Sequence, residues 1–161
     1  MIANGVVCSA PGGIFTMNTS ALLENTRYQL INQLVYFGDE LYHFLDQYCP
    51  EHNQKRLSVE KTLNVYTRVL EEILRDLTVE KLNSVALIGS KVDLRYLELN
   101  DTDSYVLVSP DSADPDQNKI SFLSPMGFHL LLARRNETYD IEIPSGIVPV
   151  RVEDIRYHCF D

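Results

Sequence analysis

The feature that most constrains the fold is a pair of apolar stripes with helical spacing, separated by a short polar stretch. Within each stripe, apolar residues recur at intervals of three, four or seven, which places them on one face of a helix. The first stripe contains Leu23, Leu30, Leu34, Leu41, Leu45 and Tyr48, and the second contains Leu63, Tyr66, Leu70, Ile73 and Leu77. Two such stripes in succession predict a helical hairpin or coiled coil over residues 18–80.

The polar stretch between the stripes predicts where the chain reverses direction. Pro50 and Asn53 interrupt the helical pattern, and Ser58 offers a cap for a second helix. We therefore expect an antiparallel hairpin with a leucine seam whose middle lies near Leu34 and Leu70. The seam leucines are Leu30, Leu34 and Leu41 on the first helix and Leu63, Leu70 and Leu77 on the second. The first helix also carries more aromatic side chains than one seam can hold, so some must face elsewhere. These aromatic residues are Tyr36, Phe37, Tyr42 and Phe44.

A different pattern occupies the C-terminal half, where a Ser-Pro step follows a short apolar run. Ser124 can cap a helix, and Pro125 suits the first helical position, where no amide donor is needed. This predicts a strand over residues 120–123 that leads into a short helix over residues 125–133. From these residues alone, the step could be only a helix cap.

The end of the chain predicts a β-hairpin. Pro144 presets φ and Gly146 tolerates positive φ, so the segment between them is suited to a turn. The strands on either side cover residues 139–143 and 148–157. Together with the two helices, these strands indicate an α+β protein.

Composition excludes several classes of function. The chain has 161 residues, of which 45% are hydrophobic, enough for one or two small soluble domains. Its net charge is −9, and no Lys/Arg cluster suggests direct, sequence-specific DNA binding. An acidic chain suits a basic protein surface, although the charge could also serve only solubility.

The cysteines and the hydropathy pattern bear on metal binding, cellular compartment and membrane association. Cys8, Cys49 and Cys159 lie far apart and lack zinc-site spacing, so we predict no metal and no cofactor. This pattern fits a reducing cytoplasm, and no apolar run is long enough to indicate a membrane partner. Residues 1–17 lack a basic signal-peptide region and are expected to be an N-terminal extension or an artefact of cloning or start-site assignment.

Several separated C-terminal motifs, taken in order, resemble the C-terminal domain of the GreA/GreB transcription factors. The resemblance spans roughly residues 84–157. It rests on residues 85–92 (VALIGSKV), 108–115 (VSPDSADP), 120–127 (ISFLSPMG), the leucines at 130–132, the turn Pro144-Ser145-Gly146 and the closing Ile155-Arg156-Tyr157.

The resemblance implies a fold and a partner. It implies an FKBP-like antiparallel β-sheet with one short helix over residues 81–161, preceded by the helical hairpin. Such domains dock on bacterial RNA polymerase at the rim of its secondary channel. The implied contact is a loop formed by Ser124, Pro125, Met126 and Gly127, called here the Ser-Pro loop.

The hairpin tip departs from the cleavage factors of this family, which present a G-D-L-x-E-N-A-E-Y motif whose carboxylates help hold magnesium. The predicted turn offers only Asp46 and Glu51 as weak candidates, and Gly38-Asp39-Glu40 lies inside the first helix. A return helix over residues 58–77 spans about 30 Å, which is roughly 10 Å short of the cleavage factors' reach. Carboxylates must come within about 2.6 Å of a metal, so the shortfall removes that role. The chain therefore looks closer to short-hairpin, non-cleaving relatives such as Rnk.

The C-terminal domain also departs from the family pattern, and three alternative functions remain open. The family's two glycines after the short helix are replaced by Ala133 and Glu137, which disfavour positive φ. Arg134-Arg135 is either a solvated helix end or a contact for an acidic polymerase surface. We expect a transcription regulator rather than an enzyme; the alternatives are a cleavage factor with an atypical tip, a peptidyl-prolyl isomerase or an unrelated interaction module. The isomerase would need an aromatic pocket, for which the candidates are Tyr105, Phe122, Phe128 and Tyr139.

Overall fold

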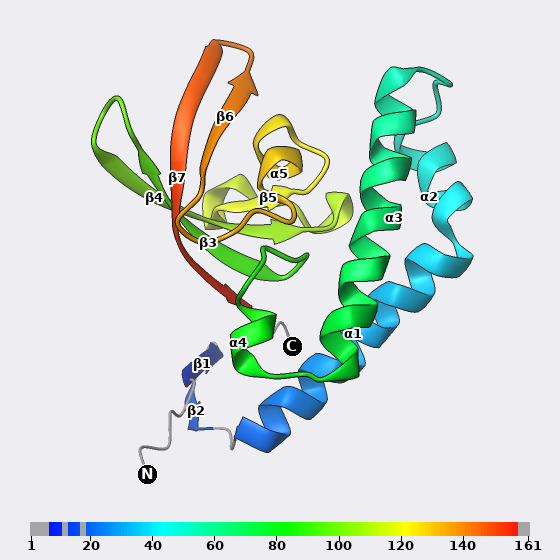
Figure 1. The fold of residues 1–161 in the computed structure, drawn as a ribbon, viewed down its shortest axis with the longest axis vertical. Coiled ribbons are helices and arrows are strands. Elements are labelled where there is room, and N and C mark those ends of the chain that lie inside the picture. Colours follow the sequence, from blue (N-terminus) through cyan, green and yellow to red (C-terminus); the bar gives the residue numbers. More distant parts are fainter. Residues whose placement is uncertain (1–6, 11–12, 17–18, 158–161) are drawn as a thin grey trace. The chain divides into compact units, whose positions relative to one another are not determined.

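The computed structural model describes residues 7–10, 13–16 and 19–157, and it confirms the α+β class (Figure 1). The chain divides into two compact units with a boundary between Thr78 and Val79. The first is called here the helical unit and the second the sheet unit.

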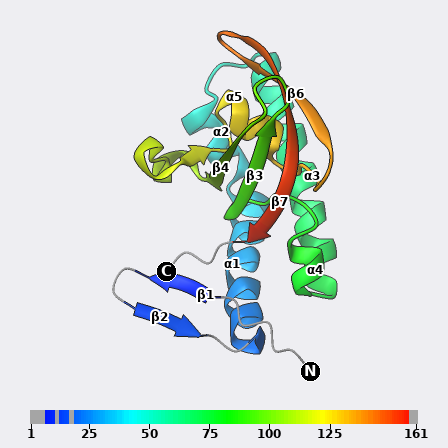
Figure 2. The same ribbon diagram turned by 90° about the vertical axis from the view of Figure 1, so that its left-hand side faces the viewer.

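The helical unit begins with a small antiparallel strand pair and continues with three helices (Figures 1 and 2). Its elements are β1 (Val7–Ala10), β2 (Gly13–Thr16), α1 (Thr19–Asp39), α2 (Leu41–Tyr48) and α3 (Gln54–Arg75). The expected N-terminal segment, residues 1–17, therefore contains the β1–β2 strand pair, and its remaining residues lie outside the described part of the chain, as does Cys159.

The first arm of the hairpin is bent at Glu40, between α1 and α2. The Glu40 amide donates to the Tyr36 carbonyl at 2.8 Å, and the Phe44 amide donates to the Glu40 carbonyl at 2.9 Å. These are helical i→i−4 bonds, so the backbone hydrogen bonding continues through the bend. Gly38 lies next to it, and glycine is a common cause of such bends.

The second arm begins earlier than the sequence analysis predicted. Its cap is Asn53, not Ser58, and the Asn53 side chain accepts a hydrogen bond from the Arg56 amide at 3.2 Å. Asparagine is among the preferred capping residues, and nothing in the Gln54–Ser58 stretch opposes a helix, so the helix gains its first turn here. The return helix has 22 residues and a length of about 33 Å.

Two hydrogen bonds between α1 and α3 fix the antiparallel register of the hairpin. Arg27 donates to the Leu74 carbonyl at 3.2 Å, and the Tyr66 hydroxyl donates to the Gln33 side chain. This register places Leu30, rather than Leu34, at the level of Leu70. Leu34 lies level with Tyr66, near the middle of α3, but it is only half-buried and so contributes less to the seam than Leu30.

Aromatic side chains fill the core of the hairpin nearer its turn. Phe37 and Phe44 are buried and contact each other edge-to-face, with ring centroids 5.6 Å apart, and Phe37 also meets the Tyr66 ring at 6.0 Å. Tyr36 and Tyr42 are exposed. The prediction that some aromatic side chains face away from the seam is therefore confirmed.

The sheet unit contains one sheet of five strands, formed by the described residues, and one short helix after the fifth strand (Figures 1 and 2). Its elements are α4 (Val79–Leu82), β3 (Ser90–Tyr96), β4 (Asp101–Val108), the 3₁₀ turns η1 (Pro110–Ser112) and η2 (Pro115–Gln117), β5 (Lys119–Ser121), α5 (Pro125–Leu130), β6 (Thr138–Ile143) and β7 (Gly146–Tyr157).

The strand order is β5-β4-β3-β7-β6, and the sheet is mixed. The β3–β4, β3–β7 and β6–β7 pairs are antiparallel as predicted, whereas β5 adds to β4 in parallel. The crossover through η1 and η2 returns the chain to the same end of β4, which makes this parallel pairing possible. Helix α5 contacts both edge strands, β5 and β6, so the sheet curls around the helix and its core.

The core of the sheet unit lies on one face of the sheet. Alternate residues of β3 and β7 are fully buried there, as expected for a sheet with one solvated face. The fully buried apolar side chains of the strands are Val92, Leu94, Leu107, Ile141, Val150, Val152 and Ile155, and Phe122 and Leu130 join them from the β5–α5 segment.

Candidate functional site

The Ser-Pro loop connects the edge strand β5 to α5, and its entry is held firmly. Phe122 follows β5, has no exposed surface and donates its amide to the Val108 carbonyl at 3.0 Å. The Leu123 amide donates to the Ser121 hydroxyl at 3.0 Å. Burial of one large ring and these two bonds fix the backbone as it enters the loop.

Ser124 makes the two hydrogen bonds that shape the loop. Its hydroxyl donates to the Ser121 carbonyl at 2.6 Å and accepts the Gly127 amide at 3.0 Å. The second bond is a helix N-cap, as the sequence predicted, with Pro125 at the start of the helix. Ser124 therefore stabilises the conformation of the loop.

Gly127 is required by a close backbone approach. A Cβ atom at this position would lie 2.0 Å from the Ser121 carbonyl oxygen and 2.8 Å from the Ser124 hydroxyl. Gly127 is buried, and no side chain fits there without moving the backbone. The close contact with the Ser121 carbonyl oxygen therefore explains why the Ser-Pro loop has glycine at position 127.

The other two residues of the Ser-Pro loop are the ones available to a partner. Pro125 is exposed and Met126 is half-buried, so both present apolar surface at the start of α5. The structure thus separates the four predicted residues into two that form the loop, Ser124 and Gly127, and two that line its surface.

The segment after α5 takes up left-handed backbone conformations without glycine. Helix α5 ends at Leu130, earlier than the predicted Ala133, and Leu132 has φ 65°. The Leu132 amide donates to the Ala86 carbonyl at 2.8 Å, and the Ala86 amide donates to the Ala133 carbonyl at 2.9 Å. These bonds offset the cost of a left-handed leucine, about 1–2 kcal/mol.

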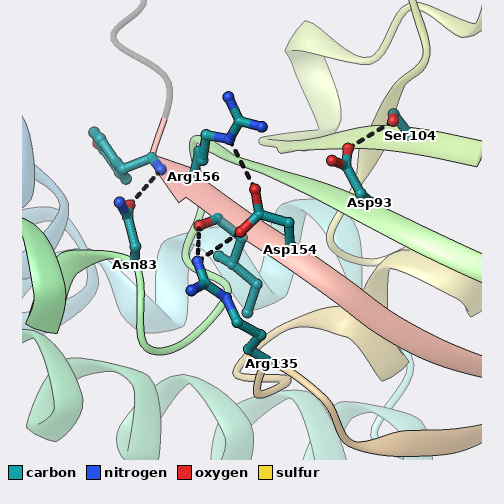
Figure 3. Close-up of polar contacts among 8 residues, drawn as sticks. Asn83, Asp93, Ser104, Arg135, Asp154 and Arg156 are labelled. Atoms are coloured by element: carbon teal, nitrogen blue, oxygen red, sulfur yellow. Dashed lines mark hydrogen bonds and ion pairs between the residues drawn. The ribbon is translucent and has the colours of Figure 1, made fainter. Parts of the chain in front are cut away.

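Arg135 belongs to an ion cluster on the solvated face of the sheet (Figure 3). It donates to Asp154 at 2.6 Å and to the Ile155 carbonyl at 3.3 Å, while Arg156 donates to the other Asp154 oxygen at 2.9 Å. The hydrogen bond and charge of Asp154 raise the pKa of Arg156. Of the predicted basic pair, Arg135 is thus bound within the sheet unit and does not lie at a helix end, whereas Arg134 is exposed.

Two tyrosine hydroxyls of the suggested isomerase pocket have structural partners. Burial, followed by hydrogen bonding with Tyr96 and Asp103, raises the pKa of Tyr105. Tyr139 donates to Glu137 at 2.7 Å and accepts the Arg134 amide at 2.9 Å; burial is the main cause of its raised pKa. Since Phe122 is a core side chain, these aromatic groups are accounted for by packing and hydrogen bonding.

The hairpin turn engages both of its candidate acids within the chain. Asp46 forms an ion pair with Arg56 at 2.8 Å, and the largely buried Arg56 also donates to the Cys49 carbonyl at 3.0 Å. Glu51 accepts a hydrogen bond from the Asn53 side chain at 3.1 Å. The turn is therefore held by its own polar groups.

Two searches of the described residues gave no further site. Within residues 7–10, 13–16 and 19–157, no three His, Cys, Asp or Glu side chains are grouped to hold a metal ion. The same part of the chain has no helix both long and apolar enough to cross a membrane.

The chain combines a helical hairpin with a curled mixed sheet and one short helix, and comparison with known proteins shows what this arrangement resembles. Residues 81–157 match the family model described as transcription elongation factor GreA/GreB, C-terminal. The sheet unit is therefore a domain of the GreA/GreB C-terminal type.

Individual relatives agree with this assignment. Transcription elongation factor GreA of Desulfovibrio desulfuricans is 34% identical over 44% of this chain and 44% of its own length. GreA of Pelagibacter ubique is 27% identical over 66% of this chain and 64% of its own length. The matching part thus spans about half to two thirds of these relatives. The solved GreA/GreB factor of Nitrosomonas europaea has the same fold, with a TM-score of 0.50, 22% identity, and coverage of 74% of this chain and 93% of that one.

Sequence reasoning missed the residues that support the motif. Ser121 was part of the quoted pattern, yet its carbonyl oxygen, which meets both Ser124 and the Gly127 position, had no predicted role. Gly89 has φ 105°, and a Cβ there would lie 3.0 Å from the Tyr157 ring. The Asn83 side chain accepts the Tyr157 amide at 2.9 Å (Figure 3). The glycine and the closing tyrosine were visible signals, but their proximity was not.

Proposed function

We propose that this protein is a bacterial transcription regulator that binds RNA polymerase at the rim of the secondary channel and does not stimulate transcript cleavage. The binding contact is the Ser-Pro loop, with Pro125 and Met126 as the contact residues and Ser124 and Gly127 as the residues that hold them. The protein acts in the cytoplasm, where the polymerase is.

The family match over residues 81–157 is the observation that carries this proposal. The relatives are named transcription elongation factors, and the Ser-Pro loop lies within the matched domain. Its geometry adds support because the exposed surface at Pro125 and Met126 is apolar and backed by a fixed backbone. Preorganised apolar residues lose little entropy when a partner covers them.

The contacts of the tip acids support the absence of cleavage activity. A carboxylate that assists metal chemistry must be directed at the ion, and each tip acid is instead held at one oxygen by a group of the turn. Asp46 is paired with Arg56, and Glu51 accepts a bond from Asn53. The 22-residue return helix is also only about 3 Å longer than the sequence analysis assumed, which leaves most of the expected shortfall in reach.

Binding is tested with Met126→Asp, compared with Ile147→Asp at the exposed β6–β7 turn. Both variants place a new carboxylate on an apolar surface residue of the sheet unit. We expect Met126→Asp to weaken binding to purified polymerase by at least about 30-fold, because a charge would be desolvated at the contact. Ile147→Asp should bind like the wild type. Equal affinity of the folded Met126→Asp variant would exclude this loop as the contact.

The proposed absence of cleavage stimulation is tested with backtracked elongation complexes. The protein alone should leave the transcripts intact, and in excess it should suppress cleavage stimulated by a cleavage-competent Gre factor through competition for one site. The Met126→Asp variant should lose this suppression. Shortening of transcripts by the protein alone, removed by Asp46→Asn with Glu51→Gln, would establish the alternative of a cleavage factor with an atypical tip.

A further inference from the structure

The seam between α1 and α3 contains a polar pair among apolar side chains. Tyr66 on α3 has no exposed surface, and its hydroxyl donates to the side chain of the half-buried Gln33 on α1. The residues about one helical turn to either side of Gln33 on this face are Leu30 and Phe37, and both are buried. The hydroxyl of Tyr66 therefore meets its acceptor at one level of α1 and would meet apolar side chains one turn away.

The apolar part of the seam allows the two helices more than one register. Leu30 and Phe37 are seven residues apart on α1, and Leu63, Leu70 and Leu77 repeat at the same interval on the other side of the seam. Sliding α3 by seven residues, or about 10 Å, therefore brings apolar side chains opposite apolar side chains again. In this register, called here the shifted register, Leu30 would face Leu77 and Phe37 would face Leu70.

The start of α3 is compatible with both registers. Asn53 caps the observed helix, but Ser58 is also a residue of the preferred capping type. A helix that began after Ser58 would lack the first five of the observed 22 residues, Gln54–Ser58, and with them about 8 Å of its length. The choice of register therefore decides how far the hairpin turn lies from the end of α3.

The polar pair distinguishes the two registers. In the shifted register, Tyr66 would lie level with Leu41, so its hydroxyl and the Gln33 side chain would be about 10 Å apart along the helix axis. A buried polar group without a partner costs more than an exchange of one apolar contact for another. Polar residues within a helical seam can specify register for this reason.

We propose that Gln33 and Tyr66 are positioning residues of the hairpin, whose hydrogen bond selects the observed register against the shifted register. The selected register keeps the cap at Asn53 and the full length of α3. Its consequence for function rests on the proposed function, because the return helix limits how far the hairpin turn can extend from the unit that binds the polymerase.

The register is measured as distances between nitroxide labels on the free full chain, so the result is independent of polymerase binding. The native cysteines are first replaced, Cys8 and Cys159 by serine and Cys49 by alanine. A change to the shifted register would lengthen one label distance and shorten another, each by about 10 Å. The two label pairs, all at exposed positions, are Glu24→Cys with Lys61→Cys and Asp39→Cys with Glu72→Cys.

The test variant is Tyr66→Phe with Gln33→Leu, which removes both polar groups and nearly keeps their shape. Its control is Tyr42→Phe with Gln47→Leu, which removes the same groups from exposed positions on α2. The wild type and the control should show one distance for each label pair. The test variant should show the second distance for both pairs in at least about a tenth of the molecules, because unpaired polar groups no longer disfavour the shifted register.

The two caps provide a further check. In the test variant, Asn53→Ala should raise the ratio of the shifted to the observed register at least about threefold, and Ser58→Ala should lower it by a similar factor. A single unshifted distance for each pair in the test variant with Asn53→Ala would overturn the proposal. Broader distances without opposite displacements would overturn it as well, because they would show loosened packing. If Asn53→Ala shifted the register of the wild type, the cap rather than the polar pair would select it.

Discussion

The helical unit and the sheet unit specify their structures by different means. In the helical unit, periodic apolar side chains decide the packing, and many residues of similar size would serve at each seam position. In the sheet unit, particular atoms decide it: the Ser121 carbonyl oxygen leaves room only for glycine at position 127, and Ser124 bonds in two directions. Glycine has a different meaning in each unit, since Gly38 meets nothing and Gly127 meets backbone.

This difference explains where the family resemblance is visible. A segment whose residues are fixed by backbone contacts keeps a recognisable pattern, and the family match begins at residue 81 and ends at 157. A helical seam needs only size and spacing, so its sequence is far less distinctive. The function proposed for the chain therefore rests on the sheet unit.

The largest expected effect separates the two glycines. Gly127→Ala should destabilise the chain by more than about 4 kcal/mol, because its Cβ would overlap the Ser121 carbonyl oxygen. Gly38→Ala should stabilise by about 0.5–1 kcal/mol, since alanine is the better helix former in open space. Urea unfolding of both variants measures the contrast. Similar small changes at both positions would show that the loop backbone can relax.

The next test concerns the seam of the helical unit. Leu70→Ala should cost about 2–5 kcal/mol because Leu70 has no exposed surface. Leu34→Ala should cost about 1 kcal/mol, since Leu34 is half-buried and alanine favours the helix. The comparison is made by thermal and urea unfolding. Equal costs would show that Leu34 contributes as much to the seam as Leu70.

A smaller effect is expected at the hairpin turn. Arg56→Ala should cost about 1–3 kcal/mol, because it removes a largely buried side chain and its bond to the Cys49 carbonyl. Asp46→Asn should cost less than about 1 kcal/mol, because the Asp46 side chain is 68% exposed and its ion pair is screened by water. If Asp46→Asn were the more costly change, the ion pair would dominate the turn.

The smallest effect is a pH dependence in the sheet unit. Burial first, and then bonding to Tyr96 and Asp103, raises the pKa of Tyr105, so the folded state favours the neutral phenol. Its contribution to stability is therefore complete below the ordinary tyrosine pKa near 10 and is lost as the pH rises above it. Urea midpoints between about pH 8 and 11 should fall less steeply for Tyr105→Phe than for the wild type. Equal slopes would contradict this role of Tyr105.

The sequence predicts the elements of both units better than their details. Leucine spacing indicates the hairpin and Ser124-Pro125 indicates α5, because both signals are local. The cap at Asn53 was assigned to Ser58 because two capping residues compete within one turn-rich stretch. The parallel pairing of β5 was missed because it depends on how far η1 and η2 carry the chain, which no local pattern encodes.

For the candidate site too, local patterns predict the residues but not their contacts. Its residues could be named from a motif, but which of them form the loop and which face outward depends on the Ser121 carbonyl oxygen, a backbone atom that every residue has. The partners of Asp46 and Glu51 were likewise hidden, because Arg56 reaches back across the turn only after α3 has started at Gln54.

The close approach at Gly127 also bears on how this surface can diverge. Position 127 accepts only glycine without a backbone shift, and Ser124 makes two hydrogen bonds that shape the loop. Pro125 and Met126 are therefore the positions of the Ser-Pro loop at which substitution disturbs the fold least. A change at Met126 alters the shape and polarity of the surface proposed here to contact the polymerase, without disturbing the backbone that presents it. Under the proposed binding mode, a single side chain can therefore change or remove the contact while the rest of the domain stays as it is.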